Sequence, residues 1–221
     1  MPDEKVKKES EAKSLPVFKS DTKKLRLHLV LSGVSLSILT IITLAVGDKR
    51  IFDAIRGFAI SHPLFLTIME GVSDYGLYVP YLIFFGIAIF GLLSKRYVLF
   101  RYAIAYFIIQ LIASVIITRV LKFAIGRGRP SDYSEKQIAR LRSDSFPSGH
   151  SADISSSAST LSYFLSSYLL RILSYLCIPV MGLSRIAVGS HYPLDVLAGV
   201  FLGLFTGYII CHVFAVKSAQ R

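Results

Sequence analysis

Several stretches of this chain are apolar over about 20 residues, the length an α-helix needs to cross a hydrocarbon layer roughly 30 Å thick. We expect six such spans, at residues 25–47, 77–94, 99–121, 150–168, 172–190 and 194–216. The fourth is diluted by serine and threonine, and Arg185 interrupts the fifth. A mean hydropathy of +0.57 also exceeds that of ordinary soluble domains. The expected fold class is therefore an all-α membrane protein, built as a six-transmembrane-helix bundle.

The polar segments define the expected organisation. Residues 1–24 are rich in Lys, Glu and Ser and have little to bury, which predicts a disordered cytoplasmic tail. Residues 25–216 form the membrane domain, and residues 217–221 a cytoplasmic C-terminal tail. No small-residue cleavage pattern follows the first span, so we expect it to persist as an anchor. Residues 50–66 place apolar side chains at helical spacing and predict an amphipathic interfacial helix, with His62 in a loop.

The formal net charge of +11 has two explanations. It could indicate nucleic-acid binding, but Lys and Arg also collect in the short cytoplasmic segments of membrane proteins. If both termini are cytoplasmic, that side holds most of the basic residues. Beyond those in the chain up to Arg26, they are Lys95, Arg96, Arg101, Arg171, Lys217 and Arg221. We therefore expect the bilayer, and not nucleic acid, to be the partner.

One segment on the expected outer side of the membrane is also rich in basic residues, contrary to this bias. Its basic residues are Lys122, Arg127, Arg129, Lys136, Arg140 and Arg142. Ionisable residues near a bilayer are costly unless they face a polar site. The segment therefore indicates such a site at the outer membrane interface.

Three short motifs at the ends of spans carry the chemistry. They are KFAIGRGRP with Lys122 and Arg129, PSGH at residues 147–150, and SRIAVGSHYPLD with Arg185, His191 and Asp195. With six spans, all three motifs lie on the same side of the membrane. We expect them to form one pocket with three fixed cations, two histidines and one carboxylate.

The PSGH motif predicts an anion-binding helix start. Pro147 suits the first turn of a helix, where its missing N–H costs nothing. The backbone N–H groups of Ser148, Gly149 and His150 would then be available to a bound anion. The guanidinium groups of Arg129 and Arg185 match phosphate oxygens through paired hydrogen bonds, and several cations without matching acids favour a phosphate group.

The two histidines predict catalysis as well as binding. His191 lies four residues before Asp195, with Pro193 as the expected first helical residue, so the carboxylate can reach back to one ring nitrogen. The other ring nitrogen would then be a nucleophile, and His150 the general acid. Each residue alone also has a structural explanation, such as a helix cap or a snorkelling cation. A metal site is the other alternative, but three cations would repel a divalent ion.

The three motifs together resemble the signature of the type 2 phosphatidic acid phosphatase superfamily of integral membrane lipid phosphatases. The resemblance covers residues 122–195, with the spacing matched inside each motif. It implies metal-independent hydrolysis without a cofactor through a phosphohistidine intermediate. Carried over by position, the phosphate-binding residues are Lys122, Arg129, Ser148, Gly149 and Arg185. His191 is then the nucleophile, Asp195 its orienting partner and His150 the acid.

The resemblance also implies a lipid phosphate substrate and a bacterial inner membrane, with the site facing the periplasm or the outside. Family substrates include phosphatidylglycerol phosphate, undecaprenyl pyrophosphate, phosphatidic acid and lipid A phosphates, and the sequence does not choose among them. A phosphotransferase or a non-enzymatic anion or lipid transporter are the alternatives. Outside the signature, Asp153 could tune His150 or simply partner the hydroxyl-rich fourth span, whose small residues favour close helix contact. The oligomeric state is open.

Overall fold

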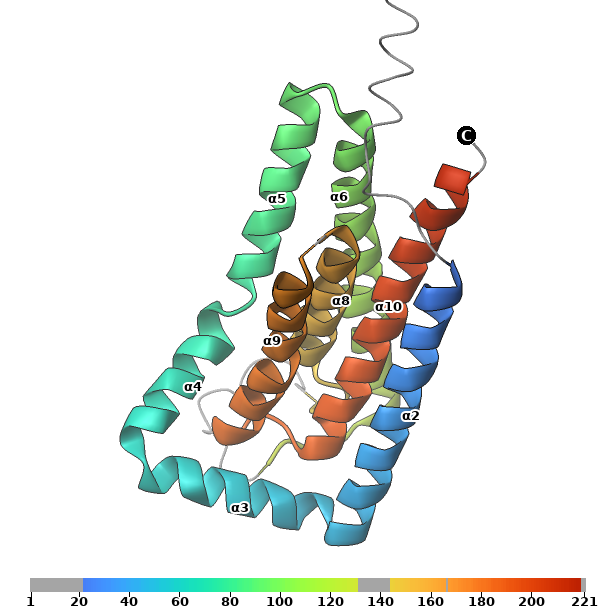
Figure 1. Ribbon diagram of the computed structural model, residues 1–221. Coiled ribbons are helices and arrows are strands. Elements are labelled where there is room, and N and C mark those ends of the chain that lie inside the picture. The colour runs from blue at the N-terminus through green and yellow to red at the C-terminus, as the bar shows by residue number, and fades with distance from the viewer. Residues whose placement is uncertain (1–21, 131–143, 166, 220–221) are drawn as a thin grey trace, which may run out of the picture.

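The computed structural model describes residues 22–130, 144–165 and 167–219, and every regular element in those ranges is a helix (Figure 1). In chain order these are α2 (Thr22–Val46), α3 (Asp48–Ser61), α4 (Pro63–Tyr75), α5 (Tyr78–Leu93), α6 (Tyr97–Gln110), a π-helical segment η2 (Leu111–Ile117), α7 (Thr118–Ile125), α8 (Gly149–Phe164), α9 (Tyr168–Ala187) and α10 (Pro193–Ala219). The tail expected at residues 1–24 lies outside the described residues up to residue 21, as does most of the loop 131–146. Helix α10 continues three residues past the expected end of the membrane domain at residue 216.

Five helical segments are long and apolar enough to cross a membrane in the described part of the chain. They are Leu29–Val46, Pro63–Leu93, Tyr97–Ile125, Tyr168–Ala187 and Pro193–Val213. Each overlaps one of the expected spans, and the second is longer than expected because α4 leads into α5. The remaining expected span, at residues 150–168, corresponds to α8, whose many hydroxyl side chains lower its hydropathy. The total of six spans stays a prediction.

Helix α8 tolerates these hydroxyl groups because its neighbours bury them. Helices α9 and α10 both pack against it, and most of its residues are buried. On α10, Gly199, Gly203 and Gly207 recur every four residues on the face toward α8. A Cβ atom at Gly199 would overlap the carbonyl oxygen of Ser148. One at Gly203 would overlap that of Ala152, so the two backbones touch as in other small-residue membrane interfaces.

Helices α5 and α6 form a second packing unit against α8 and α10. The rings of Phe84 and Tyr106 stack with centroids 3.7 Å apart, and both side chains are fully buried. The hydroxyl groups of Tyr106 and Ser157 share a hydrogen bond of 2.6 Å, which satisfies two polar groups inside the bundle. Aromatic side chains thus fill the space beside the hydroxyl-rich helix and also supply its hydrogen-bond partners.

The expected amphipathic helix at residues 50–66 is divided in two. Helix α3 ends at Ser61 and α4 begins at Pro63, so the segment holds one helix up to residue 61 and the start of a second from residue 63. Proline lacks the N–H that a helix interior needs, which explains the break. His62 connects the two helices, as expected for a loop residue. The amphipathic pattern itself is confirmed in α3, where Phe52 is buried and Arg50 is exposed.

The three sequence motifs lie at one end of the bundle. Figure 1 shows the start of α2 and the end of α10 together at the opposite end, and α3 running across the bundle below the turn that joins α9 to α10. Arg56 of α3 donates a hydrogen bond of 2.6 Å to the carbonyl oxygen of Ala187, the last residue of α9. Helix α3 therefore braces the end of the bundle that holds the candidate site.

Candidate active site

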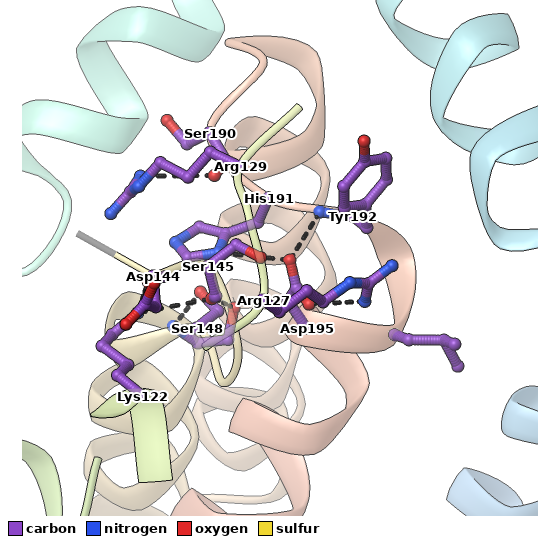
Figure 2. A network of polar contacts seen from close by, with 12 residues as sticks. Lys122, Arg127, Arg129, Asp144, Ser145, Ser148, Ser190, His191, Tyr192 and Asp195 are labelled. Carbon is purple, nitrogen blue, oxygen red and sulfur yellow. Dashed lines mark hydrogen bonds and ion pairs between the residues drawn. The ribbon is translucent and has the colours of Figure 1, made fainter. Parts of the chain in front are cut away.

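The chain after α7, the start of α8 and the turn between α9 and α10 meet at this end of the bundle. Figure 2 shows Lys122, Arg129, Ser148, His191 and Asp195 close together, although the three motifs are far apart in sequence. The convergence expected from the span ends is therefore observed. The contacts below describe what holds each part in place.

Lys122 fixes the approach to the PSGH motif. Helix α7 ends at Ile125, and Gly126 takes the left-handed conformation (φ 62°) that closes the helix end. The Nζ atom of Lys122 donates to the carbonyl oxygens of Asp144, at 2.7 Å, and Ser145, at 3.3 Å (Figure 2). The N–H of Ser145 donates in turn to the carbonyl oxygen of Arg127 at 2.7 Å. These contacts hold Asp144 and Ser145 next to the ammonium group of Lys122, just before the chain enters α8.

The start of α8 differs from the expectation in two ways. The helix begins at Gly149 with Ser148 as its N-cap, so Pro147 precedes the helix and is not in its first turn. The expectation that the Ser148 N–H meets an anion is also wrong, because it donates to the carbonyl oxygen of Asp195 at 2.9 Å. The hydroxyl oxygen of Ser148 accepts hydrogen bonds from the hydroxyl group of Ser151, at 3.0 Å, and from the backbone N–H of the same residue. The second of these bonds caps the helix. First-turn N–H groups remain at Gly149 and His150.

The turn between α9 and α10 carries the nucleophile candidate. The N–H groups of Ser190 and His191 both donate to the carbonyl oxygen of Arg185, at 3.0 and 3.2 Å. Gly189 supplies a left-handed residue (φ 81°) where the chain reverses. Helix α10 then begins at Pro193, as expected from the missing N–H of proline. The turn buries the His191 ring almost completely.

His191 and Asp195 face each other without a tight hydrogen bond. The distance from Nδ1 of His191 to Oδ2 of Asp195 is 3.6 Å, which exceeds hydrogen-bond length. The same Oδ2 accepts from the N–H of Tyr192 at 2.9 Å. The two side chains that the spacing predicted to pair therefore lie side by side, but the orienting hydrogen bond between them is not formed in this structure. Catalytic contacts are often this long before a substrate binds and tighten afterwards.

Three cations surround the histidines. Arg129 donates to the carbonyl oxygen of Ser190 at 3.3 Å, and Arg185 donates to the hydroxyl of Ser73 on α4. Burial, the largest cause, acts together with the positive charges of Arg185, Arg129 and Lys122 to lower the pKa of His191 to about 3, against the opposing effect of Asp195. The positive charges of Arg185, Arg129 and Lys122 also act on the ring of His150. His191 is therefore neutral near pH 7 and has an unprotonated ring nitrogen for attack.

Arg127 and Asp48 belong to the site, but the sequence analysis counted Arg127 only as one of several basic residues and did not single out Asp48. Arg127 donates to Oδ1 of Asp195 at 2.7 Å (Figure 2). Through its other terminal nitrogen, it donates to Oδ2 of Asp48. Burial lowers the pKa of Arg127, but the hydrogen bonds and charges of the two carboxylates outweigh this and raise it. The only available signal was an extra arginine inside the KFAIGRGRP motif. Nothing in the sequence pairs it with a residue near the start of α3.

Asp153 makes polar contacts on the side of α5 and α6. Its Oδ2 accepts from the hydroxyl of Tyr81 at 2.9 Å, and its Oδ1 accepts from the amide of Gln110 at 2.7 Å. These two partners lie on α5 and α6, whereas the structural explanation offered for Asp153 was a partner for the hydroxyl-rich fourth span. Its tuning of His150 stays a prediction.

The arrangement suits phosphoryl transfer. It combines a neutral buried histidine, a carboxylate beside that histidine, a second histidine and three cations that could hold phosphate oxygens. Among the described residues, no group of three or more His, Cys, Asp or Glu side chains is arranged to hold a metal ion. The roles of Lys122, Arg129, Ser148, Gly149 and Arg185 in phosphate binding stay predictions.

A protein-family model described as the PAP2 superfamily matches residues 103–218 of the chain. Lipid A 1-phosphatase from Rhizobium johnstonii is 34% identical over 158 residues, which cover 66% of this chain and 64% of that protein. Phosphatidylglycerophosphatase B from Bacillus subtilis is 32% identical over 104 residues, covering 43% of this chain and 50% of that protein. The chain thus spans about half to two thirds of the length of these relatives.

The fold also matches a solved membrane protein. The crystal structure of a transmembrane PAP2 type phosphatidylglycerolphosphate phosphatase from Bacillus subtilis superposes with a TM-score of 0.59 and 24% sequence identity. The match covers 83% of this chain and 96% of the other. This likeness supports the helical membrane architecture.

Proposed function

Because the chain belongs to the PAP2 superfamily, we propose that it is a membrane phosphatase that hydrolyses a phosphate monoester or pyrophosphate on a lipid. The observation that carries the proposal is the neutral, buried ring of His191, 3.6 Å from Asp195 and surrounded by cations. The relatives named above are lipid phosphatases, which supports the same reaction class.

In the first step, Nε2 of His191 attacks phosphorus, because Nδ1 faces Asp195. The new N–P bond forms as the P–O bond to the lipid breaks. His150 takes up a proton when the negative charge of the bound phosphate offsets the surrounding cations, and it gives that proton to the leaving oxygen. The phosphorylated ring keeps a proton on Nδ1 and carries positive charge, which the Asp195 carboxylate stabilises. Lys122, Arg129 and Arg185 hold the phosphoryl oxygens while charge shifts between them.

In the second step, His150, now neutral, takes a proton from water. The resulting hydroxide attacks phosphorus, the N–P bond breaks, and its electron pair returns to Nε2 of His191. Inorganic phosphate leaves, and both histidines return to their initial protonation states. Since fixed cations neutralise the phosphate charge in both steps, we propose that the reaction needs no metal ion.

The family and the charge distribution support a proposal for the lipid class and the membrane location. Candidate substrates are phosphatidylglycerol phosphate, undecaprenyl pyrophosphate, phosphatidic acid and lipid A phosphates. We place the protein in a bacterial inner (cytoplasmic) membrane, with six spans, cytoplasmic termini and the site facing the periplasm or the outside. The bias of basic residues toward the expected inner side supports this orientation.

The test is phosphate release by the purified protein from a panel of these four lipids in detergent. Rapid quench with ³²P-labelled substrate should trap acid-labile, base-stable phosphate on the protein. His191→Gln should abolish both turnover and the trapped phosphate, while His62→Gln, at an exposed position, should leave both unchanged. A phosphoenzyme that forms normally in His191→Gln would contradict the assignment of the nucleophile.

A phosphotransferase is a second candidate, because the same intermediate can pass its phosphate to a lipid hydroxyl in place of water. Product analysis separates the two reactions. Hydrolysis releases inorganic phosphate, whereas transfer yields a newly phosphorylated lipid.

A further inference from the structure

Arg127 connects two carboxylates at the edge of the site. Its Nη1 donates to Asp195 at 2.7 Å, and its Nη2 pairs with Asp48. Both terminal nitrogens are therefore committed to acids. The guanidinium group also lies over the ring of Tyr192, with its central carbon 4.5 Å from the ring centroid.

Asp48 holds this arginine from outside the signature. It is the first residue of α3, and its Oδ1 also accepts from the N–H of Leu194 at 2.9 Å. One carboxylate thus binds both the arginine and the first turn of α10. Phe52, one turn further along α3, packs edge-on against the Tyr192 ring, with centroids 5.2 Å apart.

Asp195 needs such a partner because it is completely buried. A buried carboxylate that loses its countercharge is strongly disfavoured and becomes protonated or turns away. Its Oδ2 is oriented by the N–H of Tyr192 and faces His191, while its Oδ1 is oriented by Arg127. Without Arg127, the carboxylate would lose both its charge balance and one of the two contacts that set its rotation.

We propose that Arg127, held by Asp48, is a positioning residue that orients Asp195 and, through it, the nucleophile His191. The proposal rests on the proposed phosphatase function. In this arrangement α3 serves as a support for the catalytic turn, and Arg127 does not contact the phosphate. Its removal should therefore lower kcat and leave the KM for the lipid phosphate nearly unchanged.

The kinetic test uses Arg127→Gln, Arg127→Lys and Asp48→Asn, with Arg50→Gln and Asp53→Asn as matched controls at exposed positions of α3. We expect kcat to fall about 100-fold in Arg127→Gln, since a small misplacement of a reacting group has that effect. Arg127→Lys should recover part of the loss. A rise in KM with kcat unchanged would assign Arg127 to phosphate binding and overturn the proposal.

A double-mutant cycle separates positioning from general structural support. In a protein that already carries Asp195→Asn, adding Arg127→Gln should lower kcat almost no further, because the carboxylate that Arg127 orients is no longer present. An equal loss in both backgrounds would show that Arg127 acts independently of Asp195. If Arg127→Gln fails to fold, as judged by gel filtration in detergent, the same cycle with Asp48→Asn decides the question.

A second readout does not depend on activity. In protein labelled with ¹⁵N-histidine, the ring signals of His191, assigned by their loss in His191→Gln, report which nitrogen carries the proton. We expect one tautomer, protonated at Nδ1, in the wild type and a mixture in Arg127→Gln. An unchanged tautomer would refute the positioning role, even if no lipid phosphate tested were a substrate and the proposed function itself had failed.

Discussion

The backbone N–H of Ser148 donates to the backbone carbonyl oxygen of Asp195 with an N···O distance of 2.9 Å. This bond joins the N-cap of α8 to the first turn of α10. It therefore sets His150, two residues after Ser148, at a fixed position relative to His191. The two histidines need no direct contact to keep their spacing, because the backbones that carry them are bonded to each other.

The contact between α8 and α10 predicts that Gly199→Ala lowers both stability and activity. The added Cβ would overlap the carbonyl oxygen of Ser148, so the two helices must separate. We expect a loss of about 1–3 kcal/mol in the free energy of unfolding, as for other overpacked sites. Thermal unfolding in detergent measures it. Gly86→Ala is the control, since its Cβ would meet no atom within 4 Å, and an equal loss there would contradict the packing argument.

The roles of the histidines predict that His150→Gln acts selectively on poor leaving groups. An alkyl phosphate leaves as an alkoxide that needs a proton, whereas nitrophenolate hardly needs one. Release from the lipid substrate should therefore slow much more than release from nitrophenyl phosphate, as measured by initial rates on both. Equal slowing would assign His150 to binding.

Fixed cations in place of a metal predict that activity survives chelation. Incubation with EDTA should leave the rate of phosphate release unchanged, and vanadate, which can adopt five-coordinate geometry, should inhibit. The wild-type protein without EDTA is the reference. Loss of activity on chelation, restored by added Zn²⁺ or Mg²⁺, would favour a metal-dependent reaction.

The lowered pKa of His191 predicts how stability changes with pH. The folded value is about 3 and the ordinary value is 6.5, so the unfolded chain binds more protons between these limits. Stability from this residue is complete above the ordinary value and is lost as pH falls toward 3. The unfolding temperature of the wild type should thus drop more between about pH 7 and pH 4.5 than that of His191→Gln. Parallel curves for the two proteins would be inconsistent with a buried neutral histidine.

The charge distribution predicts the membrane orientation. In a background with both native cysteines replaced, Lys136→Cys should react with a membrane-impermeant thiol reagent in cells without an outer-membrane barrier. Lys95→Cys, in the connection between α5 and α6, should not react. The opposite labelling pattern would reverse the proposed topology.

Much of the site could be predicted from the sequence because the patterns that indicate it lie within single helices or turns. The thickness of a bilayer sets a minimum apolar length, so five of the expected spans could be located from apolar stretches in the sequence. Spacing within a single turn also placed His191 next to Asp195 and made Pro193 the first residue of its helix. The small residues of the fourth span correctly indicated close helix contact.

Tertiary structure decided the contacts that connect distant segments. Ser148 was expected to offer its N–H to an anion, but that group binds the carbonyl oxygen of Asp195 on another helix. Arg127 gave no sign of its role, because its partner Asp48 lies 79 residues earlier in the chain. Hydropathy and spacing describe what one helix or turn can do by itself. Which buried donor meets which acceptor depends on how the helices pack, and that packing brought Arg127, Asp48 and Asp195 together.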